Sequence, residues 1–418
     1  MINMVELSQK AKTAAGKLAL VETGAKNTAL SKIAKQLQQS QNDILEANRL
    51  DIQAAQISGM QPAMVDRLLL DEKRWQNVIA DLNKVIELSD PVGEEFEIQK
   101  MPNGLRMSKQ RVPLGVLAVI YEARPNVTVD VAGLALKSGN AVILRGGSET
   151  IHTNQKIVQV IKQALAGTAI PADAIQFIDD PDRKYVMGML KMYDSIDMLI
   201  PRGGASLHKF CRENSLVPVI TGGIGICHLF VDEEVDIHKS IEVIRNAKIQ
   251  RPSVCNALDT VLVHRKIASQ FLPVLVDELR QNGVTFKADP AAYAMLAGVP
   301  VVEEAGPEDF DTEWLSLVLG LKLVDSVEDA IQHIHLHSTA HSDGILTEDQ
   351  SHARQFVKQV DSAAVYVNAS TRFTDGAQMG LGAEIAVSTQ RLHARGPMGL
   401  RELTTYKWIV EGEYQIRK

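Results

Sequence analysis

The sequence predicts an α/β protein with two doubly wound units, each a parallel sheet covered by helices. Three observations support this prediction: an all-helical first stretch, strands that alternate with helices from residue 114 onward, and a length of 418 residues. A chain of that length is too long for one simple core. Strands joined by helical crossovers form parallel sheets with helices on both faces.

Residues 1 to about 90 are expected to be wholly helical, because apolar residues recur at helical spacing in ALSKIAKQLQQSQNDILEANRLDIQAAQ. After SDPVGEE the pattern becomes alternating, and Pro102-Asn103-Gly104 indicates a hairpin turn. Such a hairpin needs a partner edge, within the chain or in another subunit. The C-terminal TTYKWIVEGEYQIRK also has the pattern of a strand.

Two α/β series follow, joined near residues 220–228. The first contains the strand-like runs GVLAVI, AVIL (141–144), AIQFI (174–178), IDMLI (196–200) and VPVI (217–220). The second contains CHLFVD, ALDTVLVH, LGLKLVD and AAVYVNAS, with helical stretches such as DIHKSIEVIRNAKIQ between them. Each series therefore predicts its own parallel sheet.

Composition restricts the function classes. A net charge of −7 argues against a nucleic-acid-binding surface. The amphipathic N-terminus has no signal-peptide core, and no run reaches the ~18 apolar residues of a membrane span. Cys211, Cys227 and Cys255 form neither a metal-binding spacing nor a disulfide framework, which favours a reducing compartment. We expect a cytoplasmic protein whose partners include neither nucleic acid nor membrane.

Two glycine turns are candidates for phosphate binding. VILRGGSETIH and MLIPRGGASLHKF each place an arginine and a glycine pair between a strand and a helix. The helix N-terminus then offers unpaired N–H groups to a phosphate. Neither turn matches G-x-G-x-x-G, and one such turn alone is more often structural. Two of them together favour a dinucleotide.

Cys255 is the candidate nucleophile. It lies in a polar loop, NAKIQRPSVCNALDT, near Arg251, whereas Cys211 and Cys227 are read as structural. A cysteine that attacks a carbonyl needs donors for the oxyanion, such as its own N–H and an Asn side chain. Asn126 follows a strand end in YEARPNVT, where ligands gather in open α/β sheets. An inert cysteine remains the alternative.

Two long segments carry a family resemblance. VEDAIQHIHLHSTAHSDGI and STRFTDGAQMGLGAEIAVSTQRLHARGPMGLRELTTYKW resemble the γ-glutamyl phosphate reductases, a branch of the aldehyde dehydrogenase superfamily, and the similarity runs nearly end to end. The resemblance implies an aldehyde-dehydrogenase-like fold and a homo-oligomer. It implies a cofactor-binding domain (1–95 and 116–222), a catalytic domain (223–399) and a small β oligomerisation element (96–115 and 400–418).

The resemblance also implies roles for residues of the site. Cys255 is the nucleophile, and Asn126 donates to the oxyanion together with the Cys255 N–H. The cofactor positions are Arg145, Gly146, Ser148, Gly204, Ser206 and Glu313. Ser148 falls where NAD-preferring relatives carry a glutamate that would repel a 2′-phosphate, so NADPH is expected. Glu313 falls where the family's glutamate holds the nicotinamide ribose; a solvated surface acid is the alternative.

One departure from the family pattern bears on the reaction. Hydrolytic relatives carry Glu-Leu-Gly-Gly, and their glutamate activates water; here the stretch is Ile220-Thr221-Gly222-Gly223. A thioester without that base survives long enough to exchange with phosphate. Together with this departure, the resemblance implies NADPH-dependent reduction of L-glutamyl 5-phosphate to L-glutamate 5-semialdehyde through a cysteine thioester, in proline biosynthesis. The sequence leaves open whether the chain associates functionally with glutamate 5-kinase, which makes the unstable acyl phosphate.

The substrate's groups suggest further site residues. Arginines suit its phosphate and α-carboxylate, and the candidates are Arg124, Arg251, Arg372, Arg391 and Arg395. Glu384 is the candidate for the α-ammonium group. Pairing of an arginine with a surface acid is the alternative in each case. His341 is either a site residue or a turn-capping histidine.

Two other functions compete with the reductase. One is a hydrolytic semialdehyde dehydrogenase, against which the isoleucine at position 220 argues. The other is a nucleotide-binding scaffold without catalysis, against which Cys255 and Asn126 argue.

Overall fold

The computed structural model describes residues 2–222 and 224–417 and forms two compact units. The first comprises Met1–Thr221, Gly380–Ala386 and Met398–Lys418; the second comprises Gly222–Met379 and Val387–Pro397. The segment 380–386, which carries Glu384, thus packs with the first unit. It lies within the range 223–399 that was expected to form the catalytic domain.

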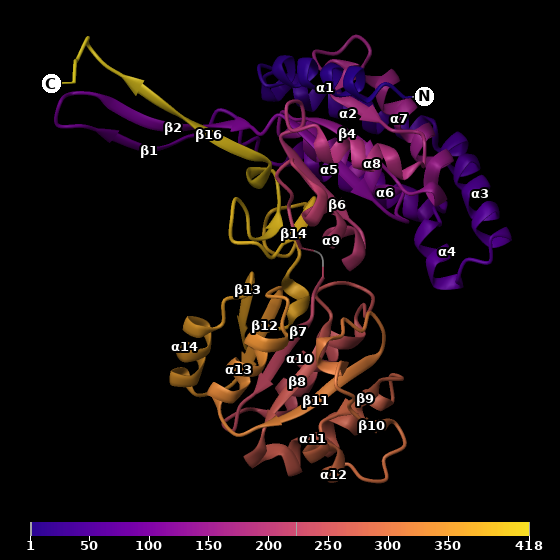
Figure 1. Cartoon of the computed structure of the whole chain (residues 1–418), viewed down its shortest axis with the longest axis vertical. Coiled ribbons are helices and arrows are strands. Elements are labelled where there is room, and N and C mark those ends of the chain that lie inside the picture. The colour runs from indigo at the N-terminus through magenta and orange to yellow at the C-terminus, as the bar shows by residue number, and fades with distance from the viewer. Residues whose placement is uncertain (1, 223, 418) are drawn as a thin grey trace. The chain divides into compact units, whose positions relative to one another are not determined.

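The N-terminal part of the first unit is helical, as predicted (Figure 1). Its helices are α1 (Met4–Leu18), α2 (Thr23–Gln39), α3 (Gln41–Ile57), α4 (Pro62–Leu68) and α5 (Glu72–Glu87). The Asp71 side chain caps α5 by accepting from the Arg74 N–H, and α5 buries Trp75 and Leu82 on its apolar face. The buried Lys26–Asp90 ion pair, at 2.5 Å, ties α2 to the segment that follows α5.

A four-stranded parallel sheet forms the centre of this unit, in the order β5-β4-β3-β6. The strands are β3 (Val116–Tyr121), β4 (Ala141–Arg145), β5 (Ile175–Phe177) and β6 (Met198–Arg202). The helices that follow them are α6 (Asn126–Lys137), α7 (Ile151–Leu165), α8 (Arg183–Lys191) and α9 (Ala205–Asn214). Because the carboxyl ends of parallel strands share one edge, both glycine turns and Asn126 lie at that edge.

The prediction of a strand at residues 217–220 is wrong. Only Val219 pairs, in an isolated parallel bridge to Leu199 of β6. Pro218 lies inside this run and has no N–H to donate, which works against a full ladder.

A separate antiparallel sheet, in the order β1-β2-β16, extends away from the helices of its own unit (Figure 1). Its strands are β1 (Glu95–Lys100), β2 (Arg106–Pro113) and β16 (Thr404–Glu411). The hairpin predicted at Pro102-Asn103-Gly104 is confirmed, and Gly104 has a φ of +91°. The C-terminal strand supplies a partner edge from the same chain.

The second unit contains a seven-stranded parallel sheet, in the order β10-β9-β11-β8-β7-β12-β13. Its strands are β7 (Cys227–Val231), β8 (Leu258–His264), β9 (Thr285–Ala288), β10 (Val302–Glu304), β11 (Val318–Val324), β12 (Ser342–Leu346) and β13 (Ala364–Val367). Its helices are α10 (Ile237–Ile249), α11 (Arg265–Arg280), α12 (Pro290–Met295), α13 (Val327–His337) and α14 (Gln350–Gln359). Two short strands, β14 (Ala386–Ser388) and β15 (Gly396–Met398), form a separate pair.

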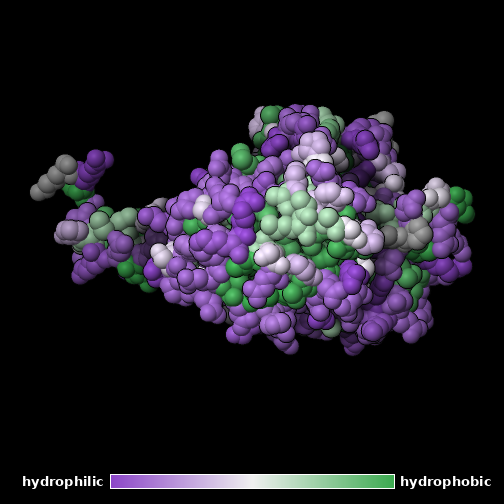
Figure 2. Space-filling view, turned by 90° about the horizontal axis from the view of Figure 1, so that it is seen from below, coloured by the Kyte–Doolittle hydropathy of each residue, from purple (hydrophilic) through white to green (hydrophobic). Residues whose placement is uncertain are grey.

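The predicted fold class, two parallel α/β sheets with a small antiparallel element, is confirmed. Figure 2 shows polar side chains over most of the visible face, with smaller apolar areas between them. In the part of the chain that the structure describes, no helix has the length and apolar character needed to cross a membrane.

Candidate active site

Cys255 lies half-buried in the loop between α10 and β8 of the second unit. The backbone carbonyl of Cys255 accepts a hydrogen bond from the thiol of Cys227 at 3.3 Å. Burial raises the pKa of the Cys227 thiol well above its usual range, so this thiol stays protonated and able to donate. The backbone of Gly225 packs so closely on the loop that an added Cβ would overlap the Cys255 carbonyl. The segment before β7, through Gly225, therefore helps to fix the position of the Cys255 loop.

Glu313 reaches the same place from the segment before β11. Its Oε1 accepts the Gly225 N–H at 2.9 Å. Burial raises the pKa of the Glu313 carboxyl group, and the Gly225 hydrogen bond partly opposes that rise. Glu313 is therefore not a solvated surface acid: Gly225 touches both Glu313 and the Cys255 loop.

Asp259 is a residue that the sequence analysis missed. It follows the cysteine loop on β8 and is nearly fully buried. Its carboxylate accepts the N–H of Cys227 at 3.3 Å and the N–H of Trp314, the neighbour of Glu313, at 3.1 Å. One signal in the sequence was available, since an aspartate interrupts the apolar run ALDTVLVH.

A buried lysine accompanies this carboxylate. Lys248 Nζ lies 3.8 Å from Asp259 Oδ1 and donates to the Leu258 carbonyl at 2.8 Å. Burial raises the pKa of Asp259 to about 6 and lowers that of Lys248 to about 8. The pair links α10, β7 and β8 beneath the cysteine loop.

Arg372 and Arg251 give this region its positive charge. Arg372 bonds to the side-chain oxygens of Asn256 and of Gln250, the latter at 3.0 Å from its Nε. Both partners are amides, so these contacts do not neutralise the guanidinium. Burial, followed by the charge of Arg251, lowers the pKa of Arg372, and the charges of Asp375 and then of Cys255 oppose this. The structure thus brings Arg372, Arg251 and Cys255 together.

Arg395 has a different environment. Its Nη1 lies 2.7 Å from Asp361 Oδ1, and Arg391 also pairs with Asp361. For these two arginines the structure shows the alternative that the sequence left open, pairing with a surface acid. Arg124 follows β3 and Glu384 lies in 380–386, so both belong to the first unit.

The segment that follows α13 supports the chain around Gly225, which contacts the Cys255 loop. Thr339 Oγ1 donates to the Ile224 carbonyl at 2.8 Å and accepts the Ile226 N–H at 3.0 Å. These two bonds hold the chain on either side of Gly225. Because Gly225 contacts the Cys255 loop, Thr339 helps to position that loop indirectly, through Gly225.

His341 is part of the interior rather than of a solvent-facing site. Its side chain is fully buried, and its Nδ1 lies 2.8 Å from Ser342 Oγ. Burial lowers the pKa of His341 to about 4, so the ring is neutral at physiological pH. The neighbouring Asp343 accepts the His228 N–H at 2.9 Å and the Ser338 hydroxyl at 2.6 Å.

In the first unit, the sheet edge carries groups that fit an anionic cofactor. Arg145 ends β4 and donates from Nη2 to the Pro181 carbonyl at 2.6 Å, while its buried Nε has no partner in the described part of the chain. Gly204 precedes α9 with open space where a side chain would be, and no side chain caps that helix. Ser206 follows in the first turn. The first N–H groups of a helix suit a dinucleotide phosphate, although the Gly204 N–H is already accepted by Glu122 at 3.3 Å.

Two acids at this edge were missed by the sequence analysis. Glu122 accepts the Gly204 N–H at 3.3 Å, and Glu149 accepts the Ala123 N–H at 2.8 Å. Glu149 directly follows Ser148, whose hydroxyl lies 3.4 Å from its Oε2. The Glu149 carboxylate is therefore turned towards the β3–α6 turn. Gly146 packs against the Asn154 amide so closely that a Cβ would overlap it.

Asn126 is the first residue of α6, directly after the turn that follows β3. Its Nδ2 donates to Asp130 Oδ2 at 2.9 Å, one helical turn further along. The amide is therefore held at the same sheet edge as the glycine turns.

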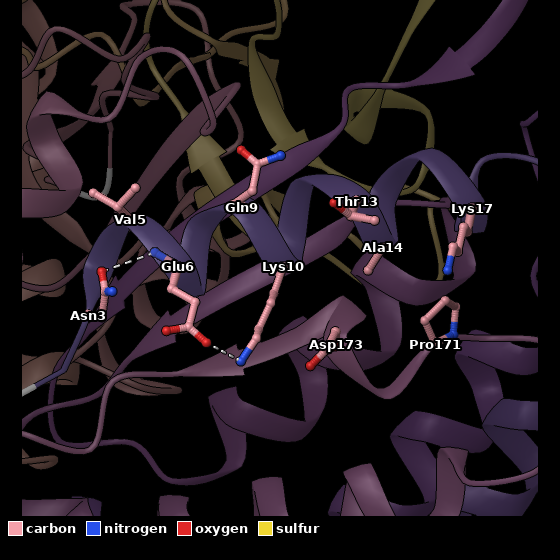
Figure 3. A pocket seen from close by; sticks show the side chains of 10 residues that line it. All are labelled: Asn3, Val5, Glu6, Gln9, Lys10, Thr13, Ala14, Lys17, Pro171 and Asp173. Carbon is pink, nitrogen blue, oxygen red and sulfur yellow. Dashed lines mark hydrogen bonds and ion pairs between the residues drawn. The ribbon is translucent and has the colours of Figure 1, made fainter.

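A cavity of about 480 Å³ lies elsewhere in the first unit, beside α1 (Figure 3). Its charged lining includes Glu6 and Lys10, which pair with each other at 2.7 Å. None of the candidate site residues lines it, so it is not the candidate active site.

Comparison with known proteins identifies the family. The model of the aldehyde dehydrogenase family matches residues 3–295. The chain belongs to the aldehyde dehydrogenase family. It is 56% identical to the γ-glutamyl phosphate reductase of Aeromonas salmonicida, over 99% of this chain and 100% of that protein. It is 54% identical to that of Photobacterium profundum, over 100% of both chains.

Solved structures agree with this assignment. The crystal structure of γ-glutamyl phosphate reductase from Thermotoga maritima is 48% identical, has a TM-score of 0.97 and is covered over 100% of both chains. An acetylating aldehyde dehydrogenase from Geobacillus thermoglucosidasius shares the fold at 18% identity, with a TM-score of 0.70 over 99% of this chain and 97% of that one.

Ile220 is the residue that was matched to the water-activating glutamate of hydrolytic aldehyde dehydrogenases. Its side chain is buried, and its N–H donates to the Leu199 carbonyl at 2.9 Å. An isoleucine has no titratable group, so this position offers no general base.

Proposed function

We propose that the chain reduces L-glutamyl 5-phosphate to L-glutamate 5-semialdehyde, with NADPH as the reductant and phosphate as the leaving group. The observation that carries the proposal is the setting of Cys255. This half-buried cysteine is fixed by Gly225 and lies near Arg251 and Arg372. The full-length similarity to γ-glutamyl phosphate reductases supports the choice of substrate.

In the proposed mechanism, the Cys255 thiolate attacks the acyl carbon, and the carbonyl electrons move onto oxygen. The Cys255 N–H and the Asn126 amide donate to that oxyanion, and each such donor stabilises a transition state by about 3–4 kcal/mol. When the carbonyl re-forms, the bond to phosphate breaks and a thioester remains. This thioester would then be reduced by a hydride, which is the chemistry that NADPH would supply when bound. The resulting thiohemiacetal collapses, which releases the aldehyde and regenerates the thiolate.

The residues proposed to hold NADPH are those that fit an anion and a ribose. Arg145 and the Gly204–Ser206 turn would hold phosphates, and Glu313 would accept from a ribose hydroxyl once it leaves Gly225. The preference for NADPH over NADH rests on Ser148 beside Arg145.

The steady-state test of this function runs the reaction backwards, because the acyl phosphate is labile. NADPH formation would be followed from glutamate 5-semialdehyde and NADP⁺, with and without inorganic phosphate. The proposal predicts turnover only with phosphate. Turnover that ignores phosphate would indicate a hydrolytic dehydrogenase, and cofactor binding without turnover in either condition would indicate a scaffold.

Arg372 is expected to bind the phosphate group. Arg372→Gln should raise the KM for phosphate in the reverse reaction about 10-fold to 100-fold, since a charge-assisted contact contributes about 1.5–3 kcal/mol. Arg372→Lys keeps the charge and should recover part of the loss. Arg391→Gln is the matched control, because Arg391 pairs with Asp361. Equal effects of the Arg372→Gln and Arg391→Gln substitutions would refute this role.

The β1-β2-β16 sheet is proposed to mediate homo-oligomerisation. β16 is an edge strand on which Tyr406, Trp408 and Val410 are about half exposed, at 46%, 54% and 53%. Edge strands with exposed apolar side chains favour pairing with another chain. Trp408→Glu should lower the mass measured by light scattering. A monomeric wild-type protein, or an unchanged mass in the variant, would contradict this proposal.

A further inference from the structure

One contact in the first unit involves a group that the proposed chemistry does not use directly. Asn126 and Asp130 lie one turn apart on α6, on the same face of the helix. The Asn126 amide nitrogen donates to the partly buried Asp130 carboxylate at 2.9 Å. Within the described residues, this is the one hydrogen bond that the Asp130 carboxylate makes.

The chemistry of the two groups makes this contact directional. The oxygen and nitrogen of an asparagine amide have nearly the same shape, so packing alone hardly distinguishes the two orientations. In its ionised form, which prevails above its pKa of about 7, the Asp130 carboxylate only accepts hydrogen bonds. It then selects the orientation in which the NH₂ edge of Asn126 faces it. One amide hydrogen is then engaged by Asp130, and the second stays available to an acceptor.

The Asp130 carboxyl group is costly to ionise in the folded chain. Burial raises its pKa to about 7, and the Asn126 hydrogen bond is the main influence that opposes this rise. The other charges acting on it are Asp81 on α5, which raises the pKa further, and Arg202 on β6, which lowers it. Perturbed carboxyl groups gather at functional sites, and the 2.9 Å hydrogen bond connects this one to the Asn126 amide.

We propose that Asp130 is a positioning residue that holds the Asn126 amide with its NH₂ edge in place, so that the second N–H can donate to the substrate oxyanion. This inference rests on the proposed function, and it adds a residue that acts on the reaction through Asn126.

A double-mutant cycle tests the inference, using reverse turnover with saturating phosphate. Asn126→Ala should lower kcat about 100-fold to 1,000-fold, as for the loss of one oxyanion donor. Asp130→Ala should lower kcat by about tenfold or more, with the KM for NADP⁺ unchanged. The double variant should be no slower than Asn126→Ala alone, because Asp130 acts only through that amide. Losses that multiply would overturn the proposal.

Stability gives a second readout, which does not depend on turnover. The folded-state pKa of Asp130 lies above the ordinary value of 3.8, so the folded chain binds this proton more tightly than the unfolded chain does. The stability linked to this proton is present at low pH and is lost as pH rises towards about 7. At about pH 8, Asp130→Asn should therefore unfold at the wild-type temperature or above it while kcat falls. A lower unfolding temperature would indicate a structural role and overturn the proposal.

A third readout separates this inference from the proposed function. In protein with ¹⁵N-labelled asparagine, the side-chain NH₂ resonance of Asn126 should shift with pH near the pKa of Asp130, and Asp130→Asn should abolish that shift. A resonance that does not titrate would overturn the inference even if the wild type is an active reductase. Absence of phosphate-dependent turnover in the wild type would instead refute the proposed function and, with it, the oxyanion role given to the second N–H.

Discussion

Cys255→Ala should abolish phosphate-dependent NADPH formation, lowering kcat by at least about 10⁴-fold, because the neighbouring Cys227 thiol is buried and stays protonated. The fold should change little, since the substitution removes one half-buried sulfur atom and leaves the Cys255 carbonyl for the Cys227 thiol. Steady-state rates with thermal unfolding of the same samples would measure both effects.

Cys211→Ala is the matched control for the nucleophile. Cys211 is buried on α9, and burial raises the pKa of its thiol to about 11, so it is a poor nucleophile. Its removal should lower stability slightly and leave kcat near the wild-type value. Substantial activity in Cys255→Ala, or an equal loss in Cys211→Ala, would contradict the assignment.

Gly225→Ala should produce the second-largest effect. A Cβ at this position overlaps the Cys255 carbonyl, a backbone atom that cannot rotate away, so the loop must move. We expect kcat to fall about 100-fold, since displacements near 1 Å at a reacting group cost about that much. The free energy of unfolding should fall by about 1–3 kcal/mol. Steady-state kinetics and urea unfolding measure these two quantities.

Gly306→Ala serves as the control for adding a methyl group in the same unit. A Cβ at Gly306 would meet its nearest neighbour, Asp309 Oδ2, at 3.7 Å, an ordinary van der Waals contact. This variant should keep wild-type kcat and stability. If Gly225→Ala were as active as Gly306→Ala, the Gly225 contact would not be what positions the nucleophile.

The two sheets were predictable because their strands are apolar runs separated by helical segments, as in AVIL (141–144) on β4. The apolar pattern failed to predict strands correctly at two places, where single residues work against it. VPVI (217–220) has the composition of a strand, but Pro218 removes a donor. β12 (Ser342–Leu346) was missed because it opens with polar residues, whose buried side chains find hydrogen-bond partners only in the folded chain.

The sequence predicted only those residues of the candidate site that a local pattern marks. Cys255 and Asn126 stand out in polar loops after apolar runs, and the Asn126–Asp130 contact follows from helical spacing. Gly225 and Asp259 act across contacts between distant segments, to Glu313 and Trp314 respectively, which no local pattern encodes. The same holds for Arg395, whose pairing with Asp361 is created by tertiary packing.

The most direct test of the central claim is a single-turnover measurement without phosphate. The protein would be mixed with NADP⁺ and glutamate 5-semialdehyde, while NADPH absorbance and the intact mass of the protein are recorded. We expect one NADPH per active site and one glutamyl group carried by Cys255, which added phosphate then discharges. Continuous NADPH formation without phosphate, or a burst without an adduct on Cys255, would contradict it.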